Sequence, residues 1–279
     1  MKFIQKIREL VKVCERFALK KNLKFSTDPD DSKSKTKCFV FSKKMKDRQN
    51  ISPVMLNGLP LPWVGQLKHL GNVLESDNSM KVDCAIKRGR FVGKVNSLLQ
   101  EFHYVESSVF IKILNIYTTS FYGSGLWDLQ STECDRLLKS WNVSIRLALG
   151  VPNTTHRYLI ESLSGCLHAK TMLSSRLVKL RDTMISSNKS SVKLLSNLVQ
   201  GDHRTVMGKN LASIQRELNM DNISPVVVKK NMKYFPLPEN QAWRIHFIKE
   251  LLEARTGKVK IDNIETDDIN NMIDLLCTT

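Results

Sequence analysis

The chain has 279 residues, 42% hydrophobic and 25% charged, and its 43 Lys and Arg against 27 Asp and Glu give a net charge of +16. These proportions fit a folded protein, and the length allows one large domain or two smaller ones, which excludes a disulfide-stapled miniprotein. The six cysteines show no Cys-x-x-Cys spacing, so we expect neither a structural zinc site nor a secreted disulfide framework. A reducing intracellular compartment, nuclear or cytoplasmic, is the simplest interpretation.

The excess positive charge predicts a polyanionic partner, because Lys and Arg neutralise phosphates and release condensed counterions. Nucleic acid is the default partner, and the alternative is that surplus lysines only keep the protein soluble. The charge is concentrated at the N-terminal end, where residues 1–50 hold fifteen basic and six acidic side chains. No stretch approaches the ~18 apolar residues of a bilayer span, so we expect no membrane partner.

The first 78 residues predict one helix followed by a small antiparallel sheet. Apolar residues recur there at steps of three and four, and we expect them to form the packing face of the helix: Phe3, Ile7, Leu10, Cys14 and Phe17. Turn formers fill residues 26–32, and a strand is expected over 38–41. Asn57-Gly58 predicts a tight hairpin between residues 54–56 and 59–61. A further strand is expected over residues 66–71.

From Ser79 onward the pattern is helical almost to the end, so the predicted fold class is α+β and predominantly α-helical. Helices are expected around residues 85–102, 109–117, 134–148, 158–163, 173–185, 191–198, 209–218, 241–254 and 267–276. Gly123-Ser124-Gly125 interrupts this series, and residues 186–191 read as an exposed linker. We divide the chain into a sheet-bearing part (1–78), a first helical part (79–165) and a second helical part (166–279).

A search for catalytic chemistry finds no active site. The adjacent acidic pairs, Asp30-Asp31 and Asp267-Asp268, read as a solvated loop and a helix start, not as carboxylates fixed around metal ions. The histidines are isolated, and no phosphate-binding glycine loop is present. We therefore assign no catalytic residue, no metal ligand and no cofactor.

The basic stretch from Lys33 to Arg48 is the best functional candidate that composition supplies. Its cations, set beside a strand and a hairpin, could follow a phosphate backbone. The neighbouring aromatics Phe39, Phe41 and Trp63 could face bases, although packing in the core is the favoured interpretation. The run Lys43–Arg48 is compatible with a nuclear signal or with a solvated surface.

The order of several short segments resembles a known family. These segments are Leu23–Ser26, Lys33–Cys38, Leu61–Val64, Lys68–Asn72, Phe121–Ser124, Leu126–Leu129, Trp141–Arg146 and Thr155–Glu161. In this order they resemble the region that follows the catalytic aspartates in reverse transcriptases of non-long-terminal-repeat (LINE-type) retrotransposons. The resemblance covers roughly the first 170 residues and fades beyond them.

The resemblance implies roles for particular residues. Lys35-Thr36 resembles the lysine motif at the end of the palm, near the phosphates of the incoming nucleotide. Residues 68–71 resemble the primer grip, a hairpin that holds the primer end, and the helices from Ser79 to Leu149 would be the thumb. The implied nucleic-acid-binding residues are Lys33, Lys35, Lys37, Lys68, His69, Gly71, Lys87, Arg88, Arg90 and Lys94.

The family's metal-binding aspartates lie in earlier palm motifs, which this sequence does not contain. We therefore expect a C-terminal part of an RNA-directed DNA polymerase that binds RNA–DNA or DNA primer–template without polymerising, and Mg²⁺ is expected only for an intact enzyme. Two alternatives stay open. The chain could be a helical protein-interaction module, or a nonfunctional, degenerate retroelement product whose unpaired strand edges aggregate.

Overall fold

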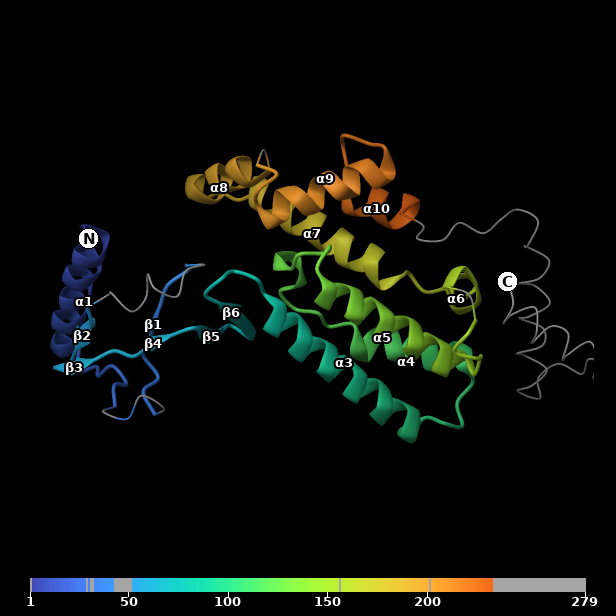
Figure 1. The fold of residues 1–279 in the computed structure, drawn as a ribbon, viewed down its shortest axis with the longest axis horizontal. Coiled ribbons are helices and arrows are strands. Elements are labelled where there is room, and N and C mark those ends of the chain that lie inside the picture. The colour runs from blue at the N-terminus through green and yellow to red at the C-terminus, as the bar shows by residue number, and fades with distance from the viewer. Residues whose placement is uncertain are drawn as a thin grey trace, which may run out of the picture. The chain divides into compact units, whose positions relative to one another are not determined.

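The computed structural model describes residues 2–28, 30, 33–42, 52–155, 157–200 and 202–232, and the chain forms two compact units, Met1–Val82 and Asp83–Thr279 (Figure 1). Helices predominate and the strands are short, which confirms the predicted class. In these ranges, no helix is both long enough and apolar enough to span a bilayer. The helices expected over 241–254 and 267–276, and the run Lys43–Arg48, lie outside the described residues. The division of the helices at residue 165 stays a prediction.

In its described residues, the first unit combines one helix with three small strand pairs. Its elements are α1 (Lys2–Lys20), β1 (Cys38–Phe39), β2 (Met55–Leu56), β3 (Leu59–Pro60), β4 (Trp63–Val64), β5 (Gln66–His69) and β6 (Asn72–Glu75). The predicted hairpin is confirmed, because β2 and β3 pair around Asn57 and Gly58, whose φ angles are 52° and 77°. Strands β5 and β6 form a second antiparallel hairpin. Strands β1 and β4 instead run parallel.

The packing face predicted for α1 is wrong. Leu10 and Phe17 are 62% and 59% exposed, whereas Ala18 is buried and Val11 packs on the cluster of Val54 and Leu56. The reason is that the strands cover the side of α1 that carries Arg8 and Glu15. The Arg8 guanidinium donates to the Ser52 carbonyl (3.1 Å), and the Glu15 carboxylate accepts from the backbone N–H of Asn57 (2.5 Å).

The second unit is a set of helices around an aromatic core. Its elements are α3 (Lys81–Glu101), α4 (Ser107–Thr118), the 3-10 turn η1 (Ser124–Leu126), α5 (Thr132–Leu149), α6 (Arg157–Ser164), α7 (Ala169–Ile185), α8 (Ser190–Gln200), α9 (Val206–Leu218) and α10 (Pro225–Asn231). Phe91 of α3 lies 5.7 Å from both Phe121 and Trp141, and Phe121 lies 6.1 Å from Trp127. These rings join α3 to α5 and η1.

Helix α7 packs against several other elements of this unit. It contacts α5, η1, α8, α9 and α10 (Figure 1), and its Leu173, Leu177 and Val178 are fully buried. No helix is predicted over Pro225–Asn231, because a proline usually separates helical segments. Proline instead occupies the first turn of this helix, where its missing N–H is not needed, and the Ser224 hydroxyl accepts from the Val227 amide.

Candidate nucleic-acid interface

The β5–β6 hairpin presents the predicted primer-grip residues at its tip. Lys68 is paired with Val73 and His69 with Asn72, and the turn between the strands consists of Leu70 and Gly71. Their φ angles of 46° and 82° match a type I′ turn, the geometry that closes a two-residue hairpin. Lys68, His69 and Gly71 are all exposed, so the hairpin offers a cation and an imidazole to solvent.

Leu70 occupies a backbone conformation that leucine rarely adopts. The left-handed region costs a residue with a Cβ about 1–2 kcal/mol, and asparagine is the usual choice before glycine in this turn. Leu70 is 74% exposed, so packing of its side chain within the unit does not offset that cost. Backbone strain that packing does not offset is typical of sites that contact a ligand.

The loop before β1 presents the predicted lysines. Ser34 is buried, its hydroxyl donates to the Thr36 carbonyl (2.9 Å), and the Thr36 amide donates to the Ser26 carbonyl (3.2 Å). These bonds fix the loop while Lys35 and Lys37, two positions apart, stay exposed. Lys33 is exposed too and forms an ion pair with Asp30 (3.4 Å), which at the surface contributes little.

The two groups of cations lie along one ribbon and not in one cluster. The amide of Cys38, which follows Lys37, donates to the Pro62 carbonyl (2.8 Å), and β4 and β5 then lead from Pro62 to Lys68. Six extended residues span at most roughly 20 Å. That length equals about six steps of one duplex strand at 3.4 Å each. The ribbon could therefore follow a backbone over several phosphates.

Helix α3 carries the remaining four predicted cations, and two of them are exposed on its surface. Arg90 and Lys94 are exposed one turn apart, and the Lys94 ammonium donates to the Tyr117 carbonyl (3.1 Å). Gly89 and Gly93 adjoin them, and a Cβ added at either glycine would meet no atom within 4 Å. Arg88 is half-buried. The exposed strip of α3 formed by Gly89, Arg90, Gly93 and Lys94 is therefore basic, and it is flat at the two glycines.

Lys87 is a correction to the predicted interface, because it lies in the interior. Its side chain is 7% exposed, and its ammonium donates to the Asp83 carboxylate (2.8 Å) and the Tyr122 carbonyl (2.5 Å). The same carboxylate oxygen accepts from the Trp127 indole N–H (2.9 Å). The spacing contained this signal, since Lys87 falls one turn after Cys84 on the buried stripe that continues at Phe91.

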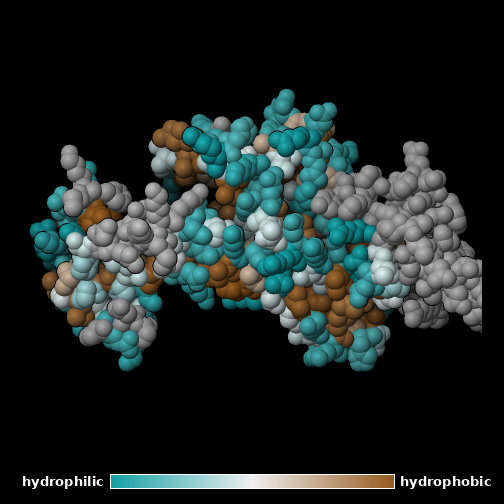
Figure 2. Space-filling model, viewed as in Figure 1, coloured by the Kyte–Doolittle hydropathy of each residue, from teal (hydrophilic) through white to brown (hydrophobic). Residues whose placement is uncertain are grey.

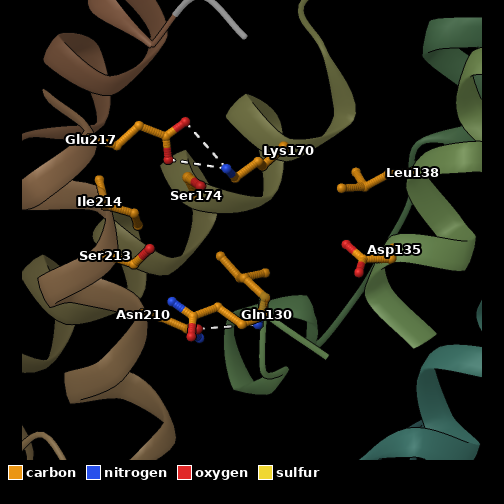
Figure 3. A pocket seen from close by; sticks show the side chains of 10 residues that line it. Gln130, Asp135, Leu138, Lys170, Ser174, Asn210, Ser213, Ile214 and Glu217 are labelled. Atoms are coloured by element: carbon orange, nitrogen blue, oxygen red, sulfur yellow. Dashed lines mark hydrogen bonds and ion pairs between the residues drawn. The ribbon is translucent and has the colours of Figure 1, made fainter. Parts of the chain in front are cut away.

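A polar hollow of about 190 Å³ opens between α5, α7 and α9 (Figure 3). On one side Lys170 is held by both oxygens of Glu217 (3.2 and 3.1 Å), while Asp135 faces the hollow from α5. At its base the Asn210 amide accepts from the Leu129 N–H (3.1 Å) and donates to the Trp127 carbonyl (2.8 Å). These bonds lock α9 to the loop before α5, which is a structural role.

The described ranges contain no group of three or more His, Cys, Asp or Glu side chains that could hold a metal ion. Burial raises the pKa of Cys84 and of Cys134 to about 12, so both thiols stay protonated and are poor nucleophiles. His168 caps α7, its ring nitrogen accepting from the Lys170 amide (3.2 Å), and burial lowers its pKa to about 4. Each of these groups serves the packing.

Comparison with known proteins gives no match to a family model, to a curated protein or to a solved structure.

Proposed function

We propose that this chain binds the sugar–phosphate backbone of a primer–template duplex, in the manner of the primer-grip and thumb regions of the reverse transcriptases that its sequence resembles. The observation that carries the proposal is the tip of the β5–β6 hairpin. There three consecutive residues are exposed, namely the cation Lys68, the imidazole of His69, and Leu70 in the left-handed backbone region, and none of them is buried in the packing of the unit.

The chemistry of the tip suits a nucleic-acid backbone. Lys68 supplies a point charge for a phosphate, and Gly71 lets the backbone approach closely because it lacks a side chain. Leu70 offers an apolar surface to a sugar or a base edge. Lys35 and Lys37, farther along the ribbon, would contact other phosphates of the same strand.

The surface of α3 supports the same proposal on the second unit. Arg90 and Lys94 each directly follow a glycine, and the only effect of these glycines on the isolated helix is to weaken it. A flat strip beside two cations allows a phosphate backbone to lie close to the helix axis. Contacts of this kind position a duplex without reading its sequence.

The experiment compares matched lysine variants in binding to a labelled RNA–DNA primer–template. Lys35→Ala and Lys68→Ala should each weaken binding and make the negative slope of log K against log salt shallower by roughly 0.9. Lys12→Ala removes a lysine of α1 that is also exposed, and it serves as the control. Equal losses in all three variants would mean that only net charge matters, and the proposed interface would be wrong.

One observation favours a protein partner as a second candidate function. Helix α8 exposes Leu194, Leu195 and Leu198 on one face, at 62%, 52% and 64%. Figure 2 shows the resulting hydrophobic patch at the end of α8. Exposed leucines at this spacing are typical of a helix that packs on another protein. Replacing all three with Ser should then abolish that association and leave nucleic-acid binding unchanged.

A further inference from the structure

A groove of about 480 Å³ lies within the second unit, apart from the hairpin and from the exposed strip of α3. Its walls come from the end of α4, the link between α6 and α7, helix α7 and helix α10. Among the described residues that line it, three are the cations Arg176, Lys179 and Lys229, and none is a carboxylate. A concave surface that gathers cations alone attracts an anion.

The positive charge of the groove is not neutralised from within. Lys179 and Lys229 are exposed, and in the part of the chain that the structure describes neither forms an ion pair. Arg176 donates to the carbonyls of Thr119 (2.7 Å) and Phe121 (3.4 Å). It thereby neutralises the partial negative charge at the C-terminal end of α4, which would otherwise repel an anion.

The other walls are apolar or weakly polar. Leu167, Met172 and Pro225 line them, together with the Cys166 thiol and the Asn115 amide that donates to it (2.7 Å). An inorganic anion would use only the cations, whereas a ligand with a phosphate and an apolar body would also cover these walls. The volume lies within the range of small-molecule sites.

We infer that this groove binds an organic phosphate of the nucleotide class, with Lys179 and Lys229 contacting the phosphate and the apolar wall covering the nucleoside. The ligand could be a free mononucleotide or the phosphorylated end of a strand, which present the same chemistry. This inference does not rest on the hairpin, since a groove variant would lose nucleotide binding while the hairpin still held a duplex.

The test uses two charge-reversal pairs that change the net charge equally. Lys179→Glu/Lys229→Glu alters the groove, and Lys139→Glu/Lys193→Glu alters exposed lysines of α5 and α8 that do not line it. Calorimetry with adenosine monophosphate should show at least about tenfold weaker binding for the groove pair only, as expected when about 1.4 kcal/mol of contact energy is lost. Equal affinities in both pairs, or no binding to the wild type, would overturn the inference.

Protection of Cys166 locates the ligand. Alkylation of the full chain at mildly alkaline pH, measured peptide by peptide, should slow at Cys166 when the mononucleotide is present and stay unchanged at the exposed Cys14. Unchanged alkylation at Cys166 would place the ligand elsewhere. Inorganic phosphate that protects Cys166 as well as the mononucleotide does would refute the nucleotide class.

A 5′-phosphorylated single-stranded oligonucleotide separates the two sources. Tighter binding of the oligonucleotide than of the mononucleotide, lost in the groove pair, would identify the strand end as the ligand. Equal affinity, again lost in the groove pair, would identify the free nucleotide. Oligonucleotide binding that the groove pair leaves intact while the mononucleotide fails to bind would overturn the inference and leave duplex binding by the hairpin untouched.

Discussion

Replacing Gly89 and Gly93 of α3 with alanine should stabilise the protein and weaken its binding to a duplex. Both glycines lie inside the helix, and a Cβ at either position would meet open space. Alanine in an exposed helix interior is favoured over glycine by about 0.5–1 kcal/mol, because glycine loses more backbone entropy on folding. The double variant should therefore gain about 1–2 kcal/mol.

Thermal unfolding measures this gain. For a domain of this size, 1 kcal/mol shifts Tm by roughly 2–4 °C, so the double variant should unfold about 2–8 °C higher in one cooperative transition. Gly208→Ala is the contrasting control, because its Cβ would collide with the Asp202 carbonyl and should lower Tm. A lower Tm for the α3 variant would mean that these glycines pack against something in the fold, which would refute the reasoning.

The duplex-binding assay on the same variants tests why α3 carries glycine there. The two added methyl groups fill the strip beside Arg90 and Lys94, so affinity for a primer–template should fall although the protein is more stable. Unchanged affinity would remove α3 from the proposed interface and leave the hairpin as its only support.

Three further predictions concern single side chains. Lys87→Met removes the ammonium that neutralises the buried Asp83 carboxylate and should cost about 3–5 kcal/mol in urea unfolding; a loss below 1 kcal/mol, about the worth of a surface pair, would contradict the buried ion pair. Burial raises the pKa of Glu161 to about 7, so between about pH 4.5 and about pH 7 the folded protein binds more protons than the unfolded chain. The free energy of unfolding should therefore fall as the pH rises through this range. Glu161→Gln should flatten that fall in a pH series of unfolding curves. Leu70→Asn should stabilise the hairpin by about 1 kcal/mol and weaken duplex binding, and stabilisation with unchanged binding would show that the strain has no role in binding.

Local patterns predicted the helices well because helices depend on neighbours in sequence. In α5 the Ser131 hydroxyl accepts from the Cys134 amide, Gly150 ends the helix with a φ of 67°, and the predicted stripe from Cys134 to Ala148 is buried. The Asn57-Gly58 turn was predicted in the same way, from its own dipeptide. In each case one short segment contained the whole signal.

The sequence did not predict features that depend on contacts between residues far apart in the chain. Strand β2 contacts α1 and decides which face of the helix is buried, and it begins more than thirty residues after α1 ends. The parallel pairing of Cys38 with Trp63, and the bonds from Asn210 to residues 127 and 129, join segments that no local pattern connects. Lys87 is a different case, because its partner Asp83 lies one turn earlier and the local spacing already placed Lys87 on the buried stripe of α3.

The most direct test of duplex binding is the affinity of the wild-type chain for an RNA–DNA primer–template across a series of salt concentrations. The proposed contacts from Lys35, Lys37, Lys68, Arg90 and Lys94 predict a slope of log K against log salt of roughly −4.5, with binding retained at physiological salt. A slope near zero, or no binding at physiological salt, would contradict the account and leave the basic surface with a role in solubility alone.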